Sequence, residues 1–137
     1  SKNDDLVSIN YFKLLFGAYY RDSWAIPAAQ TNTDRQSVSI AQVVADANNA
    51  NEFVRLDNAA ATPVDVSDWV LDEINYTIPA GSVIPANGSI YILRDDVGYR
   101  TSHTPVLVAG QYGTDLGSSG TLTLLTDASV EIDNYAY

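Results

Sequence analysis

The fold is decided by residues 52–71, which read E-F-V-R-L-D-N-A-A-A-T-P-V-D-V-S-D-W-V-L. Two runs of β-branched and aromatic residues flank a loop, and in the second run valines alternate with polar residues. Alternation with a period of two predicts half-buried strands, here at Glu52–Leu56 and Val64–Leu71, with Val64, Val66 and Val70 on one face. Trp69 is then expected to fill the space between two sheets.

The chain on both sides of this stretch has the same character from residue 38 onward. Short β-branched or aromatic runs are separated by clusters of Pro, Gly, Asn and Asp, as in Pro85–Gly88 and Gly117–Gly120. Six further strands are expected, at Val38–Ala45, Tyr76–Ile78, Ser89–Arg94, Val106–Ala109, Thr121–Thr126 and Val130–Tyr135. Eight short strands at this spacing indicate an all-β sandwich or barrel.

A family resemblance rests on the same motifs. Glu52–Asn58 and Pro63–Leu71 resemble the opening of the lamin-tail domain, whose bacterial members show E-[FWY]-V-E-L-x-N followed by P-V-D-L-S-G-W-x-L. The similarity continues to Tyr135 and covers residues 38–137. It implies an immunoglobulin-like β-sandwich without catalytic residues. Prokaryotic lamin-tail domains are accessory modules on exported proteins, so the resemblance also implies an extracellular or cell-surface location after export and N-terminal processing.

The sequence departs from the family pattern at three places. Asp68 stands where the family usually has Gly, and Arg55 stands where bacterial members usually have Glu. The segment 127–129, Asp-Ala-Ser, lacks the usual turn Gly. Each departure concerns a loop or an exposed strand face, so we expect it to alter turns and not the fold.

Composition excludes several classes of function. The 137 residues carry 17 acids against 7 bases and a net charge of −10, which repels nucleic acids and anionic membrane surfaces. There is no cysteine, so a disulfide scaffold, a thiolate zinc site and a cysteine nucleophile are excluded. No apolar run reaches the roughly 18 residues of a membrane-spanning helix.

The first 37 residues differ from the rest. An apolar segment, Leu6–Tyr20, is followed by Trp24 and a polar link, and we divide the chain into this extension (1–37) and the sandwich domain (38–137). The spacing of its large side chains favours a helix, although the same residues are also good strand formers. Uncovered apolar side chains of this number must pack against something. The expected partner-binding residues are Leu6, Ile9, Phe12, Leu15, Phe16, Tyr19, Tyr20 and Trp24.

The sequence contains few residues that could form a catalytic or metal-binding site. His103 is the only histidine and is expected in an exposed loop, so neither a Ser-His-Asp arrangement nor a zinc site is expected. The chain is therefore predicted to be non-enzymatic and to need no cofactor. Calcium is the one ion to consider, because loop carboxylates are abundant. Its candidate ligands are Asp46, Asp57, Asp65, Asp72, Asp95, Asp96 and Asp127.

Two classes of function remain open. The first is a structural or interaction module whose apolar extension docks on a neighbouring subunit or another protein, as in an extracellular filament or surface layer. The second is a monomeric accessory or attachment domain of a larger secreted protein, including one that binds carbohydrate. Aromatic rings that could stack on sugars are Tyr91, Tyr99, Tyr112 and Trp24.

Overall fold

The computed structural model describes residues 35–137. The expected helix in Leu6–Tyr20 and all eight expected partner-binding residues lie outside the described residues, so those expectations stay predictions. Thr31–Tyr137 forms one compact unit. No helix among the described residues has the length and apolarity needed to cross a membrane.

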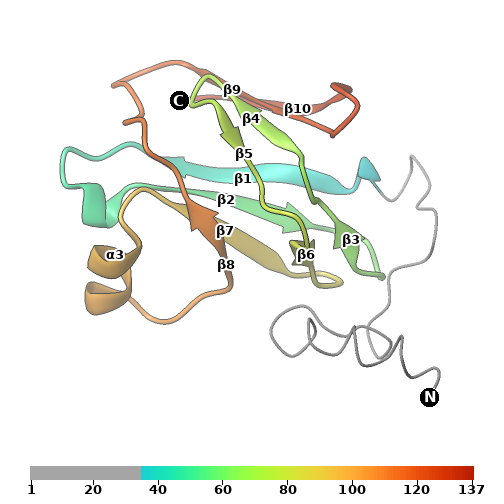
Figure 1. Cartoon of the computed structure of the whole chain (residues 1–137), viewed down its shortest axis with the longest axis horizontal. Helices are drawn as coiled ribbons and strands as arrows, with labels where there is room; N and C mark the ends of the chain where they lie inside the picture. Colours follow the sequence, from blue (N-terminus) through green and yellow to red (C-terminus); the bar gives the residue numbers. More distant parts are fainter. Residues whose placement is uncertain (1–34) are drawn as a thin grey trace. The chain divides into compact units, whose positions relative to one another are not determined.

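The domain is mostly β and its strands form several sheets, which is consistent with an immunoglobulin-like fold (Figure 1). One four-stranded sheet has the order β1-β2-β7-β8 and the other the order β10-β9-β4-β5, while β3 and β6 pair separately. All pairs are antiparallel except β7 with β8. The strands are β1 (Val38–Val44), β2 (Phe53–Asn58), β3 (Val64–Asp65), β4 (Val70–Asp72), β5 (Tyr76–Thr77), β6 (Val83–Ile84), β7 (Ser89–Leu93), β8 (Val108–Gln111), β9 (Thr121–Leu125) and β10 (Glu131–Ala136).

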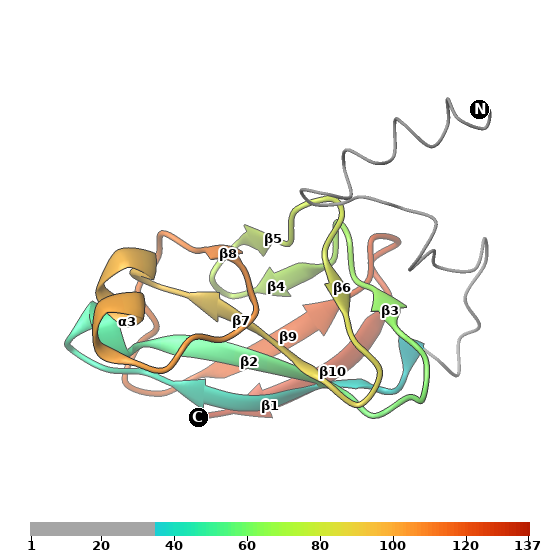
Figure 2. The same cartoon turned by 90° about the horizontal axis from the view of Figure 1, so that it is seen from below.

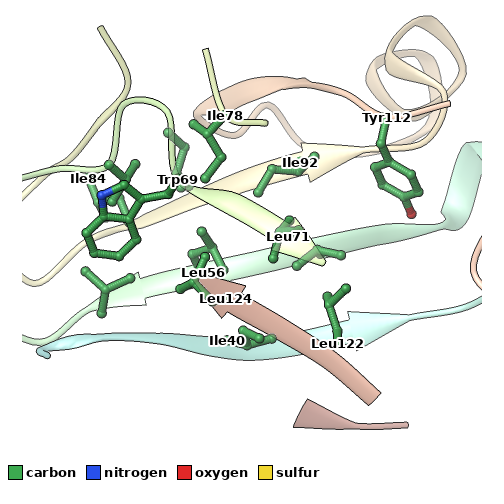
Figure 3. Packing of buried hydrophobic residues seen from close by; sticks show 14 of the residues in the cluster. Ile40, Leu56, Trp69, Leu71, Ile78, Ile84, Ile92, Tyr112, Leu122 and Leu124 are labelled. Atoms are coloured by element: carbon green, nitrogen blue, oxygen red, sulfur yellow. The ribbon is translucent and has the colours of Figure 1, made fainter. Parts of the chain in front are cut away.

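The core lies between the two large sheets and takes residues from both of them. Figures 1 and 2 show the strands of the two sheets from two directions. Alternation supplies it, because Val54 and Leu56 in β2 and Leu122 and Leu124 in β9 are fully buried while their neighbours are not. Trp69 is buried as expected. Figure 3 shows Trp69 at one end of the apolar cluster and Tyr112 at the other.

The expected strand Val64–Leu71 is wrong as a single element. The backbone turns at Asp68, whose φ is +65°, and the Trp69 N–H donates to the Val66 carbonyl (3.1 Å). The strand restarts as β4 with its faces reassigned, so Leu71 is buried and Val70 only partly so. The expected inward position of Val70 is therefore also wrong.

Three elements were not expected from the sequence: strand β6, the 3₁₀ helix η2 (Asn49–Asn51) and helix α3 (Asp96–Ser102). Asp95 caps α3, because its side chain accepts a hydrogen bond from the Gly98 N–H (3.0 Å). Helix α3 packs against η2, beside the β1–β2 connection in Figure 1. A Cβ at Gly98 would lie 2.9 Å from the Ala50 Cβ, so glycine permits this close approach.

The structure explains two of the departures from the family pattern. Asp68 and Ser129 both adopt positive φ, at +65° and +64°. Glycine adopts this left-handed region without strain, whereas other residues do so at some cost. The family's glycines therefore correspond to a backbone requirement, which this chain meets with Asp and Ser.

The two sides of the sandwich are closed differently. On one side β1 lies against β10, and the Ile40 N–H donates to the Asp133 carboxylate (2.9 Å). On the other side β8 approaches the end of β5, where a Cβ added at Gly110 would overlap the Tyr76 hydroxyl. The Tyr76 side chain therefore lies between β5 and β8 at this point. No strand of residues 35–137 pairs with the outer edge of β8.

Candidate functional site

The outer face of the β1-β2-β7-β8 sheet carries an aromatic cluster, made of Phe53, Tyr91, Tyr99 and His103. Phe53 lies next to Tyr91 (ring centroids 5.2 Å apart) and meets Tyr99 edge-on at 5.8 Å. His103 stacks on Tyr99 at 4.0 Å with nearly parallel rings. Helix α3 positions this cluster, because Tyr99 is its buried residue and packs onto the sheet.

A polar network continues the same face toward the other end of β2. The Arg55 guanidinium pairs with Asp57 (Nε to Oδ1 3.0 Å) and also donates to Gln42 (3.3 Å), and the Ser89 hydroxyl donates to Asp57 (2.7 Å). The hydrogen bond to Asp57 is the main cause of a raised pKa at Arg55. These groups satisfy one another, so they form a self-contained surface and not an obvious anion site.

Of the four rings expected to bind sugars, the structure describes three. Tyr99 and Tyr112 are buried, at 6% and 1% exposure, so neither presents a face for stacking. Burial is the first cause of the raised pKa of both hydroxyls. The expectation was wrong for these two residues because their rings fill packing positions. Tyr91 is partly exposed, and Trp24 lies outside the described residues.

Glu52 is a functional-looking residue that sequence reasoning missed. Its carboxylate is only 1% exposed. It accepts hydrogen bonds from the Tyr112 hydroxyl (3.0 Å), the Leu116 N–H (2.9 Å) and the Asp46 N–H (3.3 Å). All three donors point to this one group, so the carboxylate ties the chain that follows β8 to the β1–β2 connection.

A shallow pocket of about 320 Å³ lies beside Glu52. It is lined by Ala45, Asp46, Ala47, Asn49, Glu52, Asp115, Leu116, Gly117 and Ser118. Asp115 pairs with Arg94 (2.6 Å) and Glu52 is fully hydrogen bonded inside the protein. The carboxylates of Glu52 and Asp115 therefore already accept hydrogen bonds from the protein's own donors. These bonds hold neighbouring segments together, which is a structural role.

The carboxylates proposed as calcium ligands are scattered over the domain. Asp65 accepts from the Ser67 N–H, Asp95 caps helix α3, Asp96 pairs with Arg100, and Asp127 lies 3.8 Å from Arg35. Among residues 35–137, no three His, Cys, Asp or Glu side chains gather closely enough to hold a metal ion. Asp95 and Asp96 are both used by helix α3, since Asp95 caps it and Asp96 lies in its first turn.

His103 ends helix α3 and is not a free loop residue. Its ring stacks on Tyr99, and its Nδ1 lies 3.0 Å from both the Tyr99 carbonyl and the Ser102 hydroxyl. These contacts give the ring a packing role at the helix terminus. The Ser102 hydroxyl also donates to the Gly98 carbonyl (3.0 Å), and no carboxylate of residues 35–137 forms an ion pair with the His103 ring.

The chain also matches a known protein family. The model of the Lamin Tail Domain matches residues 31–137. The chain belongs to this family. Lamin tail domains are usually non-catalytic modules. A search of the curated proteins finds no match.

Proposed function

We propose that this lamin tail domain is a non-enzymatic interaction module, and that its apolar first 30 residues dock on a neighbouring copy or on another protein. The observation that carries the proposal is a surplus of apolar side chains outside the domain. The family match begins at residue 31, yet 12 of the first 30 residues are Leu, Val, Ile, Phe, Tyr or Trp. Side chains of this kind are stabilised by burial.

The domain's own core supports this reading. Its buried cluster draws on both large sheets, from Val38 in β1 to Leu124 in β9, and fully buried residues already face one another between them. Burying about 1,000 Å² of apolar extension elsewhere would contribute about 25 kcal/mol before the cost of ordering the segment, at roughly 25 cal/mol per Å². That is ample for a stable assembly.

Charge favours docking through the extension over contact between domain faces. Residues 31–137 hold 14 of the 17 acids and only four of the seven bases, whereas the first 30 residues hold three of each. Two domains that each carry this negative excess repel one another at low salt. A neutral apolar segment can reach a neighbouring domain without adding to that repulsion. We place the assembly outside the cell, because the Glu52–Leu71 motifs resemble those of bacterial lamin tail domains and that resemblance implies an exported protein.

The test compares the full chain with a full-length variant, Phe12→Ser with Phe16→Ser, and with a chain that starts at residue 31. Light scattering after size exclusion gives the mass, and a thermal melt shows whether each protein is folded. We expect assemblies from the full chain and folded monomers from both altered chains. A monomeric full chain contradicts the proposal. So does a shortened chain that no longer folds, because the extension would then belong to the domain's own core.

A further inference from the structure

We propose that the open edge of β8 is the acceptor, and that it receives residues Val7–Tyr11 of a second copy as an added β-strand. This inference rests on the proposed docking of the extension and names the surface on which it docks. A strand added to a sheet edge is held by main-chain hydrogen bonds, with alternate side chains providing specificity.

The hydrogen bonds of β8 show which of its backbone groups are unused by β7. The Tyr91 N–H donates to the Leu107 carbonyl (2.8 Å), and the Tyr112 N–H donates to the Leu93 carbonyl (2.9 Å). Tyr91 is paired with Val108, and Leu93 with Gln111. In a parallel ladder the residues that flank a paired position bond to the neighbouring strand, while the paired residue directs its own N–H and C=O the other way. The backbone groups of Val108 and Gln111 therefore point away from β7.

Other edges of the two large sheets are protected, and β8 is not. β1 and β10 lie against each other and are joined by Ile40 and Asp133. β5 has only two residues and follows Asn75, whose φ is +51°. β8 contains no charged residue and no proline, which are the usual devices that prevent pairing at an edge.

Apolar side chains border this edge. Leu107, directly before β8, is 47% exposed. Val108 is paired with Tyr91, whose ring lies 5.2 Å from Phe53 on the outer face. A strand laid beside β8 would place every second side chain next to this group.

The sequence of the proposed donor fits such an edge. Residues 7–11 read V-S-I-N-Y, so apolar side chains at 7, 9 and 11 alternate with Ser and Asn. The segment contains no charge, whereas the accepting domain is strongly acidic. Pairing would bury three apolar side chains on one face and leave the polar ones on the other.

The absence of cysteine from the chain allows a clean cross-linking test. Two full-length single variants, Ile9→Cys with ¹⁵N labelling and unlabelled Leu107→Cys, are mixed and mildly oxidised. The matched control replaces Leu107→Cys by Val130→Cys, which is similarly exposed (52%) but lies before β10. We expect a mixed-isotope disulfide dimer with Leu107→Cys and little or none with Val130→Cys. Because the two cysteines start on different chains, this product reports only contacts between copies.

A second measurement changes the edge without cross-linking. Leu107→Lys places a charge beside β8, and Val130→Lys is its control. We expect Leu107→Lys to weaken self-association by about tenfold or more, equivalent to about 1.4 kcal/mol, and Val130→Lys to leave it nearly unchanged. Thermal melts of both variants confirm that each is folded.

The outcomes separate this inference from the proposed function. If the full chain assembles through residues 1–30 but neither the disulfide nor Leu107→Lys shows an effect above its control, β8 is not the acceptor, although docking stands. A third protein carries both Ile9→Cys and Leu107→Cys in one chain. If its 9–107 disulfide forms only within that chain and the mixed single variants give no dimer, the extension pairs with its own domain and the exchange between copies is overturned. If the full chain is a monomer, both proposals fail.

Discussion

The two sides of this sandwich are closed by different interactions. On the β1–β10 side, a backbone N–H of one sheet, at Ile40, donates to a carboxylate of the other, at Asp133. On the β8 side, the Tyr76 side chain covers Gly110, and the chain that follows β8 is held by Glu52. On the first side the two edge strands cover each other and one β1 backbone N–H is already taken by a carboxylate, whereas on the second side the outer edge of β8 is left without a neighbouring strand among the described residues.

The largest effect is expected from removing the anchor of the β8 side. Glu52→Ala leaves the Tyr112 hydroxyl and the Leu116 N–H buried without their acceptor, at about 1–3 kcal/mol for each group. We expect a loss of about 3–5 kcal/mol in the free energy of unfolding, measured by urea denaturation. Glu52→Gln keeps one acceptor oxygen and should lose less. Equal losses for the two variants would show that the acceptor is not what stabilises this side.

Gly110→Ala tests the side-chain closure itself. The new methyl group would overlap the Tyr76 hydroxyl, so we expect a loss of about 1–3 kcal/mol in the free energy of unfolding. Adding Tyr76→Phe removes the hydroxyl and should restore most of that loss. Gly113→Ala is the control, because a Cβ there meets nothing within 4 Å. No recovery in the double variant would mean that the strand, and not the Tyr76 contact, requires glycine.

Asp133→Ala tests the hydrogen bond between β1 and β10 on the opposite side. It leaves the Ile40 N–H without its acceptor, and we expect a loss of about 1–2 kcal/mol by the same urea measurement. Asp133→Asn retains an acceptor oxygen and should recover part of it. Asp127→Ala removes an exposed ion pair to Arg35 at 3.8 Å and should cost less than about 1 kcal/mol. If Asp133→Ala is as mild as that control, the hydrogen bond does not hold this side closed.

Tyrosine ionisation is expected to leave the free energy of unfolding unchanged near neutral pH and to lower it only at alkaline pH. Burial raises the pKa of Tyr76, and burial together with the Glu52 carboxylate raises that of Tyr112. Folded pKa values above the unfolded value of about 10 contribute stability that is fully present below about pH 10 and is lost as the pH rises further. The urea midpoint should be flat from about pH 8 to 9.5 and then fall. Tyr112→Phe should reduce the steepness of that fall, and an unchanged slope would contradict the assignment.

The strands of the large sheets could be predicted because their signal is local. Leu122 and Leu124 alternate with threonines, and the two leucines are buried as the pattern requires. The break at Asp68 leaves no mark in the apolar pattern around it, and the one signal for it was that the family usually has Gly at this position. Helix α3 has only seven residues, and Asp95 as its capping residue was the one available signal.

The buried acid could not be identified from the sequence for a related reason. Glu52 stands before an alternating strand, where a carboxylate is normally solvated. Its donors Tyr112 and Leu116 lie 60 and 64 residues further along the chain. The same distance conceals the burial of Tyr112, whose ring was expected at the surface.

The sequence by itself determined the family, the β class and the surplus of apolar residues before residue 31, because alternation, turn residues and composition are properties of short stretches. Only the tertiary structure decided which carboxylate is buried, which rings are covered and which strand edge stays open. Those features depend on groups that meet across the sandwich, and the free energy of such contacts is set by neighbours that are remote along the chain.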